Sequence, residues 1–176
     1  MFWAIITKTI IVHTLTYFII GLIAFKVFNY TALLADPTHN MRQATHPLVR
    51  AGALFQPVRG FLFGIVFYLL RDILFLQTNG WLIMWIMLII VGIFSTFAAA
   101  PGSIEGFIYT KSAFGKSSFG LLEILSQSLL LSFITYYWVN HPEYVWLTWL
   151  LSIIFVMTLI FPALGLLASR VHHRLG

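Results

Sequence analysis

Residues 80–99 read GWLIMWIMLIIVGIFSTFAA and contain no charged side chain. A helix needs about 20 mostly apolar residues to cross the hydrocarbon core of a bilayer, and this stretch has that length. Comparable apolar stretches occur on both sides of it. We therefore expect an all-α integral membrane protein, built as a bundle of about five transmembrane helices with short loops.

Four further stretches complete the expected bundle. They begin and end at about residues 2 (or 9) to 28, 56 (or 60) to 76, 119 to 138 and 144 to 168. The connections at 29–55 and 100–118 are too short to form a separate soluble domain, so residues 1–176 are expected to be one transmembrane domain. The alternative is four spans, with the first helix or residues 56–76 lying at the membrane interface.

The composition of the whole chain agrees with a membrane protein. Of 176 residues, 60% are hydrophobic and only 9% are charged, and the mean hydropathy is +0.94. Soluble domains are about 25% charged, so this chain has too little polar surface to coat a water-soluble globule. A soluble enzyme, a disordered chain and a disulfide scaffold are excluded. The absence of cysteine excludes thiolate metal sites and cysteine nucleophiles.

Lysine and arginine predict the orientation, because short cytoplasmic loops carry an excess of them. The positive segments are residues 26–59, 111–116 and 170–174, whereas the turn at 77–79 is uncharged and residues 140–143 are slightly acidic. Five spans place all three positive segments in the cytoplasm, with the N-terminus outside, in the cell (inner) membrane. Lys8 is the exception. The net charge of +5 then reflects this asymmetry and anionic lipid on the cytoplasmic side, and no nucleic-acid partner is expected.

One polar face is expected inside the membrane. Glu123 lies about one turn into the fourth expected span, and Ser126 and Gln127 follow on the same helix face. An ionisable group in a span needs a partner or a wet cavity. Arg59 is expected at the same depth, so we predict an Arg59–Glu123 pair. The pair either holds two helices together or forms part of a solute- or proton-handling face.

A second polar group is expected in the outer leaflet. Arg71 and Asp72 lie near the outer end of the second expected span, where they pair with each other or meet His13 of the first span. His13 and His141 have the chemistry of metal or haem ligands. Their spacing matches no known motif, however, so we expect no metal or cofactor.

The first cytoplasmic connection combines cations with histidines: Arg42, Arg50, His39 and His46. Guanidinium groups suit phosphate oxygens, so this loop is expected to hold lipid headgroups, either specifically or as a non-specific positive surface.

The segment after the third span is expected to form a cytoplasmic lid. Ser103 is placed to cap a short helix whose polar side carries Glu105 and Lys111. The lid would join the two cytoplasmic connections.

Gly60 and Gly64 form a GxxxG pattern, which is typical of closely packed membrane helices within one chain or between copies.

These features predict a small multi-pass membrane protein that binds or permeates a small or lipidic solute through its polar face, as a homo-oligomer. One alternative is a non-catalytic accessory or assembly subunit of a larger membrane complex. Another is an enzyme that modifies lipid headgroups with His39 and His46 as general bases. No hydrolase motif occurs in the chain, so a protein without enzymatic activity is favoured.

Overall fold

A computed structural model describes residues 1–35, 42–97, 100, 102–109 and 118–175, and the elements in these ranges are helices. The long helices are α1 (Phe2–Val27), α4 (Gln56–Leu69), α6 (Gly80–Ile89), α8 (Ser118–Asn140) and α9 (Val145–Leu175). The short helices are α2 (Tyr30–Ala35), α3 (Pro47–Arg50), α5 (Arg71–Leu74) and α7 (Ile104–Tyr109). The 3₁₀-helix η2 (Gly52–Phe55) leads into α4, and the π-helical turn η3 (Ile90–Phe94) ends α6.

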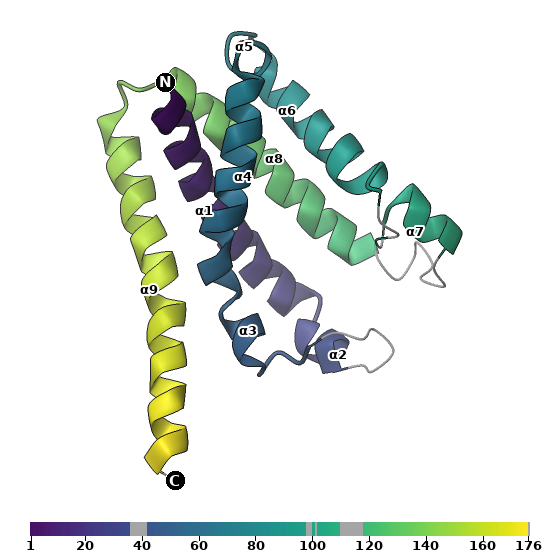
Figure 1. Ribbon diagram of the computed structural model, residues 1–176, viewed down its shortest axis with the longest axis vertical. Coiled ribbons are helices and arrows are strands. Elements are labelled where there is room, and N and C mark those ends of the chain that lie inside the picture. The colour runs from purple at the N-terminus through teal and green to yellow at the C-terminus, as the bar shows by residue number, and fades with distance from the viewer. Residues whose placement is uncertain (36–41, 98–99, 101, 110–117, 176) are drawn as a thin grey trace.

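Helix α1 is the centre of the bundle. It packs most extensively against α4, then against α8 and α9, while α6 packs on α8. The long helices alternate in direction, so that the N-terminus, α5 and the α8–α9 turn lie at one end, and α2, α3 and the C-terminus lie at the other (Figure 1). We call these the N-terminal and C-terminal ends of the bundle.

Among the described residues, three helices are long and apolar enough to cross a membrane: α1, the continuous η2–α4 segment Gly52–Leu69, and residues Val145–Leu167 of α9. The apolar segment Gly80–Phe94 is shorter. At 1.5 Å per residue it is about 22 Å long, less than the roughly 30 Å of hydrocarbon in a bilayer. Helix α8 is long enough, with 23 residues, but less apolar. The structure therefore supports an all-helical protein with three candidate spans.

Two of the expected spans have different bounds in the structure. The second begins at Gly52 and its main helix ends at Leu69, where the backbone of Leu70 leaves the helical conformation. The third stops at Phe94, because the Ser95 amide bonds the carbonyl of Ile90 and the wider π turn ends the helix. Neither helix end is caused by a proline, since the residues at which the helices stop are Leu70 and Ser95.

The GxxxG pattern of Gly60 and Gly64 packs against a helix of the same chain. The sequence alone did not decide between this and packing between copies. A Cβ on Gly60 would lie 2.7 Å from Ile10 Cα, and one on Gly64 would lie 3.0 Å from Ile6 Cα. Both glycines are buried. Helices α1 and α4 therefore approach so closely that a Cβ at Gly60 would force the backbones apart, and one at Gly64 would be tightly crowded.

Helix α8 contributes a row of small hydroxyl side chains to the interior: Ser128, Ser132 and Thr135. Ser132 donates to the carbonyl of Ser128 at 2.8 Å, and Ser128 donates to that of Leu125 at 3.0 Å. Because the hydroxyls are satisfied by their own helix, they can be buried in a membrane bundle at little cost. Thr135 is the exception, since its buried hydroxyl has no partner among the described residues.

Candidate functional site

Glu123 is the carboxyl group around which the candidate site forms. Its Oε2 accepts a hydrogen bond from the hydroxyl of Tyr30, the first residue of α2. Asn29 makes this contact possible, because it adopts a left-handed conformation (φ 49°) that turns the chain from α1 into α2. The Phe25 ring meets the Tyr30 ring edge-on, with centroids 6.3 Å apart. A Cβ on Gly21 would lie 4.0 Å from Glu123 Oε1, so α1 lines the site as well.

The phenol of Tyr30 is a neutral donor. Burial raises the pKa of Tyr30 above its ordinary value, and the neighbouring Glu123 carboxylate raises that pKa further. The hydroxyl therefore stays protonated at physiological pH and donates to Glu123. The contact joins residues 93 positions apart, and no pattern within either segment indicated it.

Arg59 is not the partner of Glu123. Its guanidinium Nη1 donates to Gln56 Oε1 at 3.4 Å, and its side chain is exposed on α4. The ion pairs between described residues do not include Arg59 with Glu123. The expected pair is thus replaced by Tyr30–Glu123 and Gln56–Arg59, and the carboxyl group has no cation beside it from the described residues.

The other members of the expected polar face differ in burial. Gln127 is half-buried and Ser126 is exposed, whereas the next residue, Ser128, is buried. Adjacent residues on a helix point about 100° apart, so α8 presents Glu123 and Gln127 on one side and the hydroxyl row on another.

His13 is fully buried, with 1% of its surface exposed, and packs on α4. Its Cβ would lie 3.4 Å from a Cβ on Gly60, and its ring meets Phe63 with centroids 5.0 Å apart. Neither ring nitrogen has a hydrogen-bond partner among the described residues. This places His13 beside Gly60 and Phe63 of α4, and the contacts between described residues do not join it to Arg71 or Asp72, which was one of the two expected arrangements.

Arg71 and Asp72 pair locally, which was one of the two expected arrangements. Arg71 Nε lies 3.6 Å from Asp72 Oδ1. Its guanidinium also lies 4.8 Å from the Tyr68 ring centroid and donates to the Tyr68 carbonyl at 3.3 Å. This pair is a surface contact at the N-terminal end of the bundle, since Asp72 is exposed.

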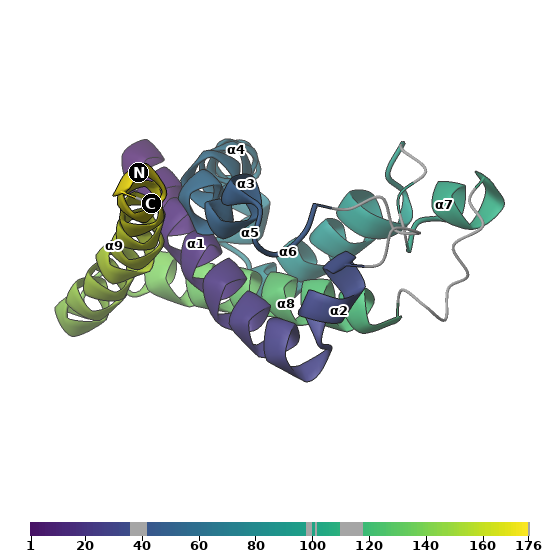
Figure 2. The ribbon, with the colours of Figure 1, turned by 90° about the horizontal axis from the view of Figure 1, so that it is seen from below.

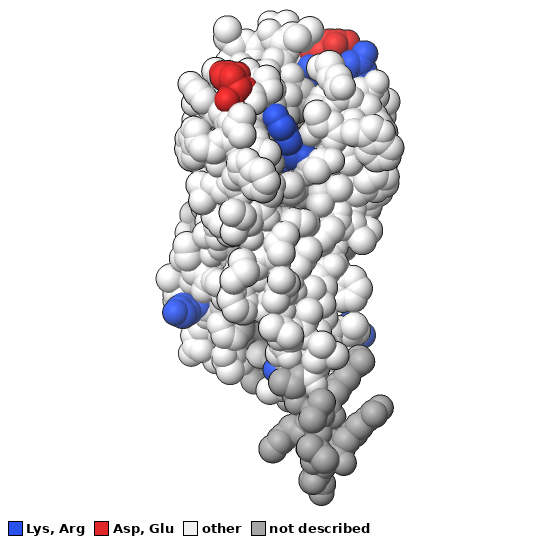
Figure 3. All heavy atoms as spheres, turned by 90° about the vertical axis from the view of Figure 1, so that its left-hand side faces the viewer, with Lys and Arg blue, Asp and Glu red and all other residues white. Residues whose placement is uncertain are grey.

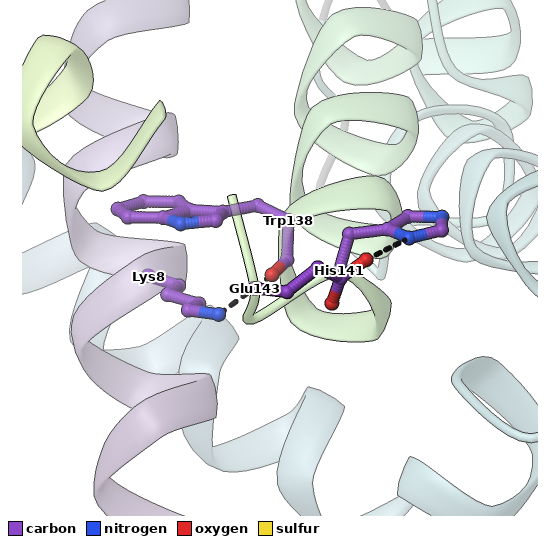
Figure 4. A network of polar contacts seen from close by, with 4 residues as sticks. All are labelled: Lys8, Trp138, His141 and Glu143. Carbon is purple, nitrogen blue, oxygen red and sulfur yellow. Dashed lines mark hydrogen bonds and ion pairs between the residues drawn. The ribbon is translucent and has the colours of Figure 1, made fainter. Parts of the chain in front are cut away.

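Lys8 is half-buried between α1 and α8, so its charge is used in a contact within the chain. Its ammonium donates to the Trp138 carbonyl at 2.6 Å, close to the C-terminal end of α8 (Figure 4). It also lies 5.2 Å from the centroid of the Trp138 ring. Carbonyls at a helix C-terminus favour a cation, so Lys8 acts as a link between α1 and α8.

The turn after α8 has its own polar contact. His141 Nδ1 lies 2.9 Å from Glu143 Oε1, as the second dashed line in Figure 4 shows. A hydrogen bond to its own backbone lowers the pKa of Glu143, and His141 lowers that pKa further. No cluster of three metal-ligating side chains occurs in the part of the chain that the structure describes.

The residues of the first connection have separate positions. The amide of Leu48 donates to His46 Nδ1 at 3.2 Å, so His46 caps α3. Arg42 and Arg50 are exposed. His39 lies outside the described residues, and so does Lys111 of the expected lid.

The described part of the lid segment is capped as predicted. Ser103 Oγ accepts a hydrogen bond from the Gly106 amide at 2.9 Å, which confirms the cap of α7. Glu105 is half-buried. Figures 1 and 2 both place α7 beyond α6 and α8, away from α3.

Comparisons with known protein families, with curated proteins and with solved structures give no match to this chain.

Proposed function

We propose that the protein is a five-span membrane protein that binds or permeates a small or lipidic solute at Glu123. In this proposal the N-terminal end of the bundle faces outward and the C-terminal end faces the cytoplasm. The protein acts without catalysing a reaction, as a homo-oligomer.

Two features support five spans. Helix α8 packs on the candidate span α1, and α6 packs on α8. Segments α6–η3 and α8 run from and towards the N-terminal end in alternating directions (Figure 1). On the face drawn in Figure 3, lysines and arginines stand alone towards the C-terminal end, whereas both signs of charge occur at the N-terminal end. An excess of positive charge at one end is typical of the cytoplasmic side.

One observation supports a solute site above all: the half-buried Glu123 carboxyl group is held by a neutral phenol. If Glu123 only held two helices together as an ion pair, a lysine or arginine would be expected beside its carboxylate. A carboxyl group without one is costly in a membrane unless it has a function, such as binding a cationic group or exchanging a proton. Glu123 Oε1 and the half-buried Gln127 are further polar groups on this side of α8.

The test is a flux measurement in proteoliposomes that contain the pH dye pyranine. Methylammonium or a proton gradient is applied as the probe, and dye response gives the rate. We expect Glu123→Gln to lower the protein-dependent rate about tenfold or more, Glu123→Asp to lower it less, and the exposed neighbour variant Ser126→Ala to leave it unchanged. Equal rates for the original protein and Glu123→Gln, with both folded, would refute the proposal.

An accessory subunit is the second candidate, and the exposure of α9 favours it. Only 6% of the apolar window in Val145–Leu167 is buried within this chain. Such a face suits partner helices as well as lipid. Co-purification with other chains at a fixed stoichiometry in mild detergent would support this candidate, and a stable species of this chain alone would oppose it. A headgroup-modifying enzyme has less support, because the His46 ring is used to cap α3.

A further inference from the structure

A groove of about 350 Å³ lies between α1 and α9. Most of its lining is supplied by Phe18, Leu22 and Ile23 of α1 and by Ile154, Met157 and Phe161 of α9. Thr158, which is 3% exposed, is the polar residue among the described lining residues. The volume falls within the range of roughly 300–1,000 Å³ that is typical of ligand sites. The groove is lined by residues of two candidate spans, α1 and α9.

The lining favours a flexible apolar chain over a second helix. Helices approach each other in membranes through Gly, Ala and Ser, which let two backbones come close. None of the described residues that line the groove is one of these three. Phe, Ile, Leu and Met side chains project from both helices and leave an irregular surface. A flexible acyl chain can follow such a surface more closely than a straight helix can.

Lys26 gives the groove a charged end. It follows Leu22 by four residues and Ile23 by three, so it lies on the same face of α1, one turn nearer the C-terminal end. Lys26 is exposed, and the ion pairs between described residues do not involve it. An apolar groove followed by an exposed cation matches the order of acyl chain and phosphate in an anionic phospholipid.

We propose that the α1–α9 groove binds one acyl chain of an anionic phospholipid, whose phosphate contacts Lys26. The inference rests on α1 and α9 crossing the membrane and does not depend on the solute site at Glu123. The lipid would be part of the structure and would link α9 to the rest of the bundle.

The experiment is native mass spectrometry of the delipidated full chain, titrated in detergent with phosphatidylglycerol or with phosphatidylcholine of the same acyl chains. We expect one phosphatidylglycerol to be retained more tightly than phosphatidylcholine. Since one cation near a membrane surface contributes about 1 kcal/mol, Lys26→Gln is expected to weaken phosphatidylglycerol retention about fivefold. The control Arg71→Gln removes a cation at the opposite, N-terminal end of the bundle and is expected to change little.

A matched pair of variants tests the groove itself. Ile23 and Val156 are exposed to similar extents, 54% and 50%, but Ile23 lines the groove and Val156 does not. Ile23→Trp is expected to lower retention of both lipids, and Val156→Trp to leave retention unchanged. Equal effects of the two variants, or equal retention of the two lipids, would overturn the proposal. Loss of a dimer in Ile23→Trp would also overturn it, by assigning the groove to a second copy. Circular dichroism checks that each variant is folded.

Discussion

Helix α1 forms two very different interfaces, one with α4 and one with α9. Towards α4, Gly60 and Gly64 bring the two backbones together, and a Cβ at Gly60 would lie 2.7 Å from Ile10 Cα. Towards α9, bulky side chains on both helices leave a groove. The difference indicates that one side of α1 is specified for close packing within the chain, whereas the other side leaves the space for which a lipid is proposed above. It also shows that apolar composition alone does not tell the two sides apart.

The comparison predicts its largest effect for a pair of phenylalanines. Phe67 of α4 is completely buried, whereas Phe161 of α9 is 59% exposed. Phe67→Ala leaves a cavity in the core and is expected to cost about 3 kcal/mol or more of unfolding free energy. Phe161→Ala is expected to cost less than about 1 kcal/mol, as a surface change does. Unfolding in detergent measures both, and similar losses would mean that α9 is buried in an assembly.

A pair of glycines sharpens the same comparison. Gly60→Ala forces α1 and α4 apart and is expected to cost about 1–3 kcal/mol. Gly165 of α9 has open space where its Cβ would be. Gly165→Ala is therefore expected to raise stability slightly, by up to about 1 kcal/mol, because alanine favours the helix. The melting temperatures of the two variants in detergent should move in opposite directions, and a loss in both would contradict the assigned interfaces.

Lys8 tests a third side of α1, the one that faces α8. Lys8→Met removes the ammonium from the Trp138 carbonyl while keeping the length of the side chain. A charged hydrogen bond is worth about 1.5–3 kcal/mol, and solvent at this half-buried site reduces the value, so we expect a loss of about 1 kcal/mol. An unchanged denaturation midpoint would show that the contact does not contribute to stability.

The smallest effect is expected at the α8–α9 turn. Because the pKa of Glu143 is lowered in the folded protein, its ionised form stabilises the fold. This stability is present above the pKa of the unfolded chain and is lost as the pH falls through the folded pKa. We expect a small decrease in melting temperature at acidic pH, below about pH 4, which Glu143→Gln removes. A decrease of the same size in the variant would assign the effect to another group.

The sequence predicted what depends on local pattern. Residues 80–99 and the other apolar stretches indicated a helical membrane protein, and three of the stretches form candidate spans. The Ser103 cap was also predicted, because it needs only residues one turn apart. The glycines of α4 predicted close packing but not its partner. That partner, α1, follows from the register of two helices, which no single segment contains.

The candidate site was less predictable. Glu123 was identified as costly in a membrane, but its partner was expected among cations. The turn at Asn29 instead brings a neutral phenol, Tyr30, to the carboxyl group. The contacts of Lys8 and His13 could not be predicted for the same reason. The carbonyl end of α8 determines the surroundings of Lys8. A glycine of α4 determines those of His13. These contacts depend on how helices pack and on where a helix ends.

Chemical modification of Glu123 from the membrane tests the central claim most directly. A hydrophobic carbodiimide reacts with protonated carboxyl groups in the hydrocarbon region, and peptide mass spectrometry locates the product. If Glu123 is held only by a neutral phenol, it is modified in the original protein and faster in Tyr30→Phe, while Glu123→Gln removes the product. An unreactive Glu123 in both the original protein and Tyr30→Phe would contradict the account, since it would show a carboxylate that is paired with a cation.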